Sequence, residues 1–195
     1  KDRYSLVIDE AHNLYQRGVE YYSPTLDVSE LISISTFEIG DKLSKRFKKL
    51  VSDAIDLVES FRPKNGRSGQ VELKLSPFEN IQERLHQLLI DYFVECDELW
   101  DNDPVLEFYG HWANFLEVLQ SAGEESKFSY IFDHTREFLK ITCCDPSKYL
   151  KEIHDEFHSS IAFSATLKPF NFYQTMSGFS ENAVQQEFDS GFPAE

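Results

Sequence analysis

The sequence has few cysteines and no long apolar run, and both absences exclude whole classes of protein. Its three cysteines (Cys96, Cys143 and Cys144) include an adjacent pair and no C-x-x-C motif, so they make no disulfide framework and indicate a reducing compartment. The apolar runs are far shorter than the ~20 residues that span a bilayer, and the first residues predict neither a signal peptide nor a transit peptide. We therefore expect a soluble, cytoplasmic protein with no membrane partner.

Basic residues are also scarce. The chain has 19 lysines and arginines against 34 aspartates and glutamates, and the formal net charge of -15 excludes a histone-like or generally basic nucleic-acid binder. Any contact with nucleic acid must therefore be local. The sequence does contain 41% apolar and 14% aromatic residues over 195 positions, which is enough to fill the core of one or two domains.

The hydrophobic pattern predicts a mainly α chain with minor β-structure, an α+β fold. Strands are expected at 4–9, 128–134, 137–143 and 160–164, and helices at 41–61, 76–100, 104–122 and 145–157. The first strand, YSLVID, is compact and apolar, which is typical of a strand buried on both faces. Ser76 and Asp103 are the expected N-caps of the second and third helices.

The order of these elements predicts an insertion. A strand is followed by a mainly helical block with a hairpin, and a short strand then returns near the end. This order favours two neighbouring strands of one sheet, separated by an inserted domain, over two domains in series. We expect the first and last strands to pair in parallel, because parallel strands need a long connection.

Acidic residues directly follow the first strand. Asp9-Glu10-Ala11-His12 would lie at the carboxyl edge of the sheet, where nucleotide sites of α/β proteins are built. One carboxylate there can hold Mg²⁺, and a second can orient and deprotonate a water that attacks a γ-phosphate. The alternative interpretation is that the four residues simply begin a solvated helix.

Small hydroxyl residues follow the last strand. Ser164-Ala165-Thr166 supplies two hydroxyls where the chain turns near a phosphate or a carboxylate. Together, VIDEAHNL and FSATLKPFNFY resemble the Walker B box and motif III of superfamily 2 helicases, and specifically the bacterial branch of the XPD/DinG-like DNA helicases. The resemblance extends to four further segments, at 20–24, 108–116, 144–147 and 190–193.

This resemblance implies a role for each motif residue. Asp9 would help bind the Mg²⁺ of ATP, Glu10 would be the catalytic base and His12 would sense the nucleotide and motif III. Ser164 and Thr166, on either side of Ala165, would couple hydrolysis to DNA movement. The implied cofactors are ATP and Mg²⁺. The implied partners are single-stranded or forked DNA and the remaining motor lobes of the same polypeptide.

The resemblance also implies a domain organisation. Residues 1–20 would carry the Walker B strand and DEAH box of a RecA-like lobe, and residues 21–145 would form an arch domain that encloses single-stranded DNA. Residues 146–195 would add a helix, the motif III strand and the start of a linker to a second lobe. The sequence has no G-x-x-x-x-G-K-[ST] motif, so the chain is expected to be a fragment that is inactive alone.

The three cysteines cannot hold a [4Fe–4S] cluster, which needs four thiolates. In the family, the cluster cysteines lie before the Walker B box, so a cluster is possible only upstream of this chain. We expect Cys96, Cys143 and Cys144 to be buried thiols.

Charge is unevenly distributed along the chain. Residues 42–67 contain eight basic and three acidic residues, and Lys42, Lys45, Arg46 and Lys49 recur at helical spacing. This ridge is a candidate for contacts with DNA phosphates, and an ordinary solvated face is the alternative. Residues 79–107 contain nine acidic residues and one arginine, which favours solvent or a protein partner. A non-catalytic acidic adaptor is therefore the alternative function.

Two histidines, His154 and His158, are separated by one helical turn in the fourth predicted helix. That spacing can bind Zn²⁺, but the zincin pattern is absent, because Asp155 follows the first histidine where that pattern has glutamate. We expect a polar helix face here. The isolated histidines are interpreted as structural; they are His86, His111 and His134.

Overall fold

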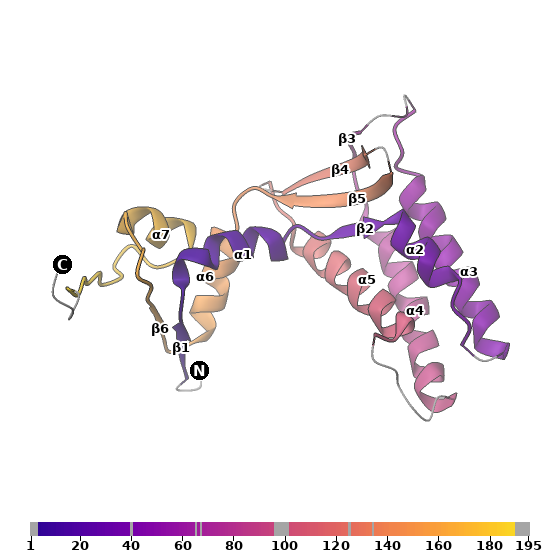
Figure 1. Ribbon diagram of the computed structural model, residues 1–195, viewed down its shortest axis with the longest axis horizontal. Helices are drawn as coiled ribbons and strands as arrows, with labels where there is room; N and C mark the ends of the chain where they lie inside the picture. The colour runs from indigo at the N-terminus through magenta and orange to yellow at the C-terminus, as the bar shows by residue number, and fades with distance from the viewer. Residues whose placement is uncertain are drawn as a thin grey trace, which may run out of the picture. The chain divides into compact units, whose positions relative to one another are not determined.

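A computed structural model describes residues 4–39, 41–64, 66, 68–95, 102–124, 126–133 and 135–189, without the side chains of residues 41 and 42. Contacts divide the chain at Glu20 and at Cys144. Residues up to Glu20 and from Asp145 onward form one compact unit, called here the terminal unit. Tyr21–Cys144 form the other, the inserted unit (Figure 1). Long helices and two small sheets confirm the predicted α+β class.

The terminal unit contains the predicted parallel pair. β1 (Ser5–Ile8) lies beside β6 (Ser159–Ala162), with Ser5 opposite Ser159 and Ile8 opposite Ala162 (Figure 1). Backbone hydrogen bonds extend the pairing beyond both strands, from His158 N to Tyr4 O (2.9 Å) and from Phe163 N to Ile8 O (3.0 Å). The predicted insertion between two parallel strands is therefore confirmed, although β6 begins and ends slightly earlier than expected.

The expectation that β1 is buried on both faces is wrong. Exposed and half-buried residues alternate along β1 and along β6. Val7 and Ile161 are paired across the two strands and keep 61% and 56% of their surface exposed. The reason is that this sheet has only two strands among the described residues, so the face bearing Val7 and Ile161 is left open.

The described residues of the terminal unit also form four helical elements. They are η1 (Ala11–Asn13), α1 (Leu14–Tyr21), α6 (Ser147–Glu156) and α7 (Phe170–Met176). The expected helix at 145–157 is confirmed as α6, which begins at Ser147, where the Asp145 carboxylate accepts a hydrogen bond from the Ser147 amide at 2.9 Å. The sequence pattern predicted neither α1 nor α7.

The inserted unit packs helices against an antiparallel sheet. The helices are α2 (Val28–Ser35), α3 (Asp41–Glu59), α4 (Leu75–Glu95) and α5 (Pro104–Ser121). The sheet has the order β2-β5-β4-β3, with β2 at Thr25–Asp27, β5 at Arg136–Cys143, β4 at Ser126–Asp133 and β3 at Gly69–Gln70 (Figure 1). The β4–β5 hairpin is the one that the sequence predicts.

The core of the inserted unit is aromatic. Its largest fully buried side chains come from all three long helices and from the hairpin: Phe47, Phe78, Phe108, Trp112, Phe115, Tyr92 and Tyr130. The indole Nε1 of Trp112 donates to the carbonyl of Phe78 at 3.0 Å, so this buried polar group is satisfied. This core packs the long helices of the inserted unit against one another and against the hairpin.

The helix starts confirm one expected cap and correct another. Asp103 is the N-cap of α5, and its Oδ1 accepts from the amides of Val105 (2.9 Å) and Leu106 (3.3 Å). Ser76 is not an N-cap, because α4 already begins at Leu75. Its side chain therefore lies within the first turn. The expected continuation of this helix to residue 100 falls on residues 96–101, which lie outside the described part of the chain.

Two further expectations concern cysteines and membranes. Cys143 is buried as predicted, whereas Cys144, which follows the end of β5, is exposed. Cys96 lies outside the described residues. No helix in the described ranges is long and apolar enough to cross a membrane.

Candidate active site

The parallel strands bring two distant motifs to one edge of their sheet. Asp9 directly follows β1, and Ser164 lies two residues after the end of β6. The amide of Ala11 donates to the carbonyl of Phe163 at 3.1 Å, which ties the two strand ends together. Ala11 is almost fully buried, so this junction is well packed. The carboxyl edge of parallel strands is where α/β proteins place nucleotide sites.

Three side chains meet at this edge. His12 Nδ1 lies 2.7 Å from Ser164 Oγ and 3.1 Å from Glu10 Oε2. Ser164 Oγ in turn donates to Glu10 Oε2 at 3.4 Å. An Nδ1–H group on His12 satisfies both of its contacts, because the hydroxyl proton of Ser164 is already directed at the carboxylate. A carboxylate, an imidazole and a hydroxyl thus form one hydrogen-bonded cluster.

The backbone at Glu10 is unusual and explains how the cluster forms. Glu10 has φ 49° and ψ 42°, the left-handed conformation that non-glycine residues adopt at a cost of about 1–2 kcal/mol. This turn redirects the chain from β1 into η1 and places Glu10 and His12 on the side of Ser164. Backbone conformations of this kind are concentrated at functional sites. The Glu10 side chain remains 62% exposed and therefore open to a ligand.

The remaining motif residues lie beside the cluster. Asp9 is exposed, and its Oδ1 accepts from the Glu10 amide at 2.7 Å. The Thr166 amide donates weakly to Ser164 Oγ at 3.4 Å, while Ala165 and Thr166 are exposed. Carboxylate oxygens at Asp9 suit a hard cation such as Mg²⁺. No group of three or more His, Cys, Asp or Glu side chains in the described ranges is arranged to hold a metal ion.

The predicted DNA-binding cations lie on α3, and two of them are already paired. Arg46 forms an ion pair with Asp91 of α4, and Lys49 Nζ lies 2.7 Å from Asp53 Oδ1. The hydrogen bond that Lys49 donates to Asp53 raises the pKa of Lys49 above its ordinary value. Lys45 is exposed, and the side chain of Lys42 lies outside the described part of the chain. The ridge is thus partly neutralised by neighbouring carboxylates.

The histidine pair does not have the expected helical geometry. α6 ends at Glu156, so His158 lies beyond the helix and the two imidazoles do not share a face. His154 instead contacts Ser160 and Ser177. Of the isolated histidines, His86 packs its ring against that of Tyr109, with the ring centres 6.3 Å apart. His111 lines a pocket in the inserted unit, and His134 lies outside the described residues.

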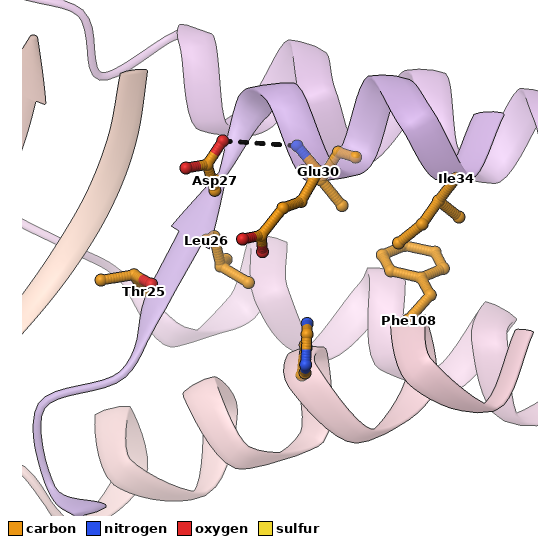
Figure 2. A pocket seen from close by; sticks show the side chains of 8 residues that line it. Thr25, Leu26, Asp27, Glu30, Ile34 and Phe108 are labelled. Atoms are coloured by element: carbon orange, nitrogen blue, oxygen red, sulfur yellow. Dashed lines mark hydrogen bonds between the residues drawn. The ribbon is translucent and has the colours of Figure 1, made fainter. Parts of the chain in front are cut away.

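That pocket lies between β2, α2 and α5 and contains none of the predicted site residues (Figure 2). It is lined by Thr25, Leu26, Asp27, Glu30, Leu31, Ile34, Phe108 and His111. Its free space is about that of one water molecule, which is too small for a nucleotide.

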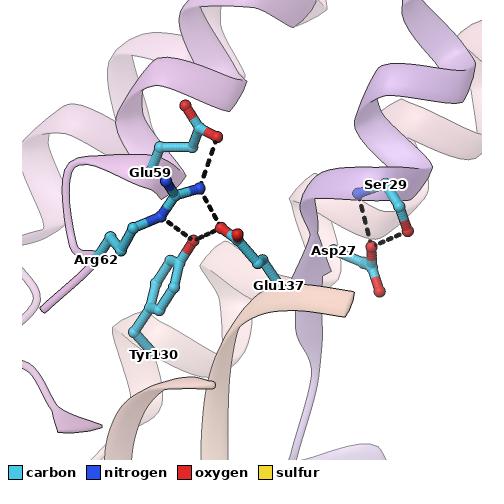
Figure 3. A network of polar contacts seen from close by, with 6 residues as sticks. All are labelled: Asp27, Ser29, Glu59, Arg62, Tyr130 and Glu137. Carbon is cyan, nitrogen blue, oxygen red and sulfur yellow. Dashed lines mark hydrogen bonds and ion pairs between the residues drawn. The ribbon is translucent and has the colours of Figure 1, made fainter. Parts of the chain in front are cut away.

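Sequence reasoning missed two polar clusters that hold the inserted unit together (Figure 3). In one, Tyr130 donates to Glu137 at 2.6 Å, and Arg62 contacts Tyr130, Glu137 and Glu59. Burial and the hydrogen bond to Glu137 raise the pKa of Tyr130.

The other missed cluster is centred on Asp27, the buried N-cap of α2. Its carboxylate accepts from the Ser29 amide at 2.8 Å and from Arg136 Nε at 2.8 Å. The only sequence signal was an aspartate two residues before a serine, ahead of an apolar run. That signal is too common to be selective.

The fold has counterparts among solved structures, although no family model and no curated protein matches the sequence. A structure titled "XPD_Helicase" aligns with a TM-score of 0.54 and 18% identity over 93% of this chain and 30% of its own. "XPD_APO" aligns with a TM-score of 0.52 and 20% identity over 93% of this chain and 34% of its own. "Truncated XPD" has a TM-score of 0.52 and 18% identity over 93% of this chain and 49% of its own.

The chain therefore spans between about a third and a half of these solved structures. The likeness covers both of its units, since it includes nearly the whole chain. At these identities the likeness concerns the fold, and it confirms the predicted resemblance at that level. This chain has the fold of a part of XPD helicase structures.

Proposed function

We propose that this chain is the part of an ATP-dependent DNA helicase that carries the DEAH box, an arch domain and the SAT motif. The observation that carries this proposal is the cluster of Glu10, His12 and Ser164 at the edge of a parallel strand pair. In an unrelated adaptor, nothing would favour a contact among these three side chains, which come from both sides of an inserted domain in the sequence. The likeness to XPD structures supports the same conclusion.

In this proposal each side chain of the site has a chemical task. Glu10, exposed at the sheet edge, orients a water molecule and takes its proton as the water attacks the γ-phosphate. Asp9 helps hold the magnesium ion of ATP, which would supply charge neutralisation on the phosphates. His12 contacts Glu10 and donates through Nδ1 to Ser164, so that a change at the catalytic carboxylate alters the contacts of the SAT segment. Thr166 acts with Ser164 in coupling hydrolysis to DNA movement.

The inserted unit is proposed to be the arch domain that helps to enclose single-stranded or forked DNA. Its well-packed aromatic core supports this role, because a frame around a strand must keep its shape. Exposed cations on α3 are the candidate phosphate contacts, with Lys45 the most accessible in the described part of the ridge. Lys42, Arg46 and Lys49 remain candidates, although Arg46 and Lys49 would have to leave their carboxylate partners.

The chain alone is proposed to be inactive as an ATPase. Its sequence contains no phosphate-binding loop that would cradle the β- and γ-phosphates. ATP and Mg²⁺ would bind where this chain meets the remaining motor lobes of the same polypeptide. An iron–sulfur cluster, if the polypeptide has one, would be held outside this chain.

The proposal is tested by measuring ATP hydrolysis by the full-length protein with and without single-stranded DNA. We expect magnesium-dependent turnover that DNA stimulates, and no turnover by the 195-residue chain. Absence of turnover in the full-length protein, or turnover by the short chain in a clean preparation, would contradict the assignment.

A non-catalytic acidic adaptor is the second candidate function. The ion pairs of Arg46 with Asp91 and of Lys49 with Asp53 favour it, because they reduce the positive potential of α3. A titration with fluorescent ATP on the full-length protein separates the two candidates, since an adaptor would bind no nucleotide.

A further inference from the structure

One imidazole in the terminal unit joins three separate segments. His154 lies on α6, and its Nδ1 is 3.1 Å from Ser160 Oγ on β6. Its Nε2 is 3.0 Å from the carbonyl oxygen of Ser177, just after α7. The ring also stacks on Phe179, with the ring centres 4.2 Å apart. These contacts therefore reach the strand that precedes the SAT motif and the turn that follows α7.

The hydrogen bond to Ser177 fixes the position of one proton on the imidazole. A carbonyl oxygen only accepts, so Nε2 must carry the proton that it donates to Ser177. In the neutral imidazole, Nδ1 accepts a hydrogen bond from the hydroxyl of Ser160. Burial lowers the pKa of His154, which favours this neutral form, although the carbonyl of Ser177 and the charge of Asp155 act in the opposite direction.

The turn that receives this hydrogen bond is fixed against α6. Ser177 is 1% exposed, and Gly178 has φ 72°. A Cβ on Gly178 would lie 2.4 Å from the Ser147 carbonyl oxygen and 2.5 Å from the Lys151 amide nitrogen. Both the backbone conformation and the lack of space therefore require glycine here. The end of α7 cannot shift along α6 without disrupting the close packing of Gly178 against the α6 backbone.

The two partners of His154, Ser160 and Ser177, lie on either side of the SAT motif in the sequence. The SAT loop, residues 163–169, connects β6 to α7. Ser160 lies in the strand that enters the loop, and Ser177 caps the helix that leaves it. A single side chain thus fastens both ends of the segment that contains Ser164.

We propose that His154 is a positioning residue that holds the SAT loop so that Ser164 stays in contact with His12 and Glu10. It touches none of the reacting groups and acts through Ser160 and Ser177. The effect on the position of Ser164 follows from the contacts above. The effect on ATP hydrolysis rests on the proposed function.

The test uses three variants of the 195-residue chain and observes the His12 ring and the Ser164 amide by NMR. His154→Phe keeps the stacking on Phe179 and removes both hydrogen bonds. His154→Gln retains a side-chain amide that can donate to Ser177. His158→Phe is the matched control, because His158 is exposed and its side chain lies outside the cluster.

We expect His154→Phe to shift or broaden the His12 and Ser164 signals, His154→Gln to restore them in part, and His158→Phe to leave them unchanged. Unchanged signals in folded His154→Phe would overturn the proposal. If that variant fails to fold, Ser160→Ala removes only one hydroxyl and should shift the same signals in the same direction. Unchanged signals in Ser160→Ala would then overturn it.

The catalytic consequence is read in the full-length protein. We expect His154→Phe to lower kcat for ATP roughly 10-fold with KM unchanged, because displacement of a positioned group slows the step and leaves binding intact. A general loss of folding would instead reduce the active fraction and the unfolding midpoint together. If the NMR shifts occur but the full-length wild type hydrolyses no ATP, the proposed function fails and the positioning role of His154 stands.

Discussion

His12 Nδ1 lies 2.7 Å from Ser164 Oγ, although 152 positions separate the two residues in the sequence. The parallel register of β1 and β6 produces this contact, since the two strands end at the same edge of the sheet. The whole inserted unit lies between these residues in the chain and none of it lies in the contact. A motion of either strand end would therefore be communicated to the other motif.

The coupling between His12 and Ser164 predicts a non-additive pair of substitutions. We expect His12→Ala and Ser164→Ala to show a coupling free energy of about 0.5–1.5 kcal/mol in a double-mutant cycle, the usual range for one hydrogen bond. Urea unfolding of the four proteins measures it. His158→Ala paired with Ser164→Ala is the control and should be additive, and additivity for both pairs would show that the contact is absent in solution.

Asp27 predicts a large cost for truncation in the inserted unit. Its buried carboxylate caps α2 through Ser29 and pairs with Arg136, so Asp27→Ala should lower the free energy of unfolding by about 2–4 kcal/mol. Asp27→Asn keeps an acceptor for the cap and should cost less. Chemical denaturation followed by tryptophan fluorescence measures both costs, and equal costs would contradict the capping role.

The same carboxylate predicts acid sensitivity. Burial raises the pKa of Asp27, but the hydrogen bonds from Ser29 and Arg136 outweigh it and leave the pKa below the ordinary 3.8. As the pH falls, the Asp27 carboxylate therefore takes up a proton in the unfolded chain before it does so in the folded chain. The stabilisation of the folded state by this carboxylate is present above pH 3.8 and is lost as the pH falls through the lower pKa of the folded state. Wild type should lose stability in this range more steeply than Asp27→Asn, as measured by urea midpoints; parallel pH profiles would exclude the shift.

His154 predicts a second pH dependence, in the terminal unit. Its folded pKa is below the ordinary 6.5, so the unfolded chain takes up a proton first as the pH falls below 6.5. The contribution of neutral His154 to the stability of the folded state is therefore complete above pH 6.5, and it declines as the pH falls from there toward the pKa of the folded state. The difference in unfolding midpoint between wild type and His154→Phe should shrink between about pH 7.5 and about pH 5.5. A difference that stays constant would contradict the neutral form described above.

The paired cations predict unequal effects on DNA binding. Lys45→Gln should weaken single-strand binding by the full-length protein and flatten the salt slope by roughly 0.7, the value for one phosphate contact. Lys49→Gln should have a smaller effect, because Asp53 already binds Lys49. Lys127→Gln, on β4, is the control. If all three variants bind as wild type over a range of salt concentrations, the ridge is an ordinary solvated face.

Much of the fold could be predicted because long amphipathic helices and a hairpin leave periodic patterns in the sequence. α3, α5 and the β4–β5 hairpin are of this kind. β2 and β3 contain three and two residues, too few to show a period. The burial of β1 was predicted wrongly because an apolar run records the composition of a strand and says nothing of how many neighbours cover it.

The candidate site was predictable only in part, for a similar reason. The order of the motifs indicated that Glu10 and Ser164 belong together, and the structure adds their hydrogen bonds. The pairing of Arg46 with Asp91 was hidden, because the partners lie 45 residues apart on different helices. The contacts of His154 could not be predicted either, since they depend on a turn after α7 whose conformation requires a glycine at position 178.

The most direct test of the central claim is ATP-dependent strand separation of a forked DNA by the full-length protein and its Glu10→Gln variant. The account predicts that wild type separates the strands. It predicts that Glu10→Gln still binds ATP but hydrolyses it about 100-fold or more slowly, because the general base is lost, and separates no strands. Strand separation by Glu10→Gln at the wild-type rate, or none by wild type with ATP and Mg²⁺ present, would contradict it.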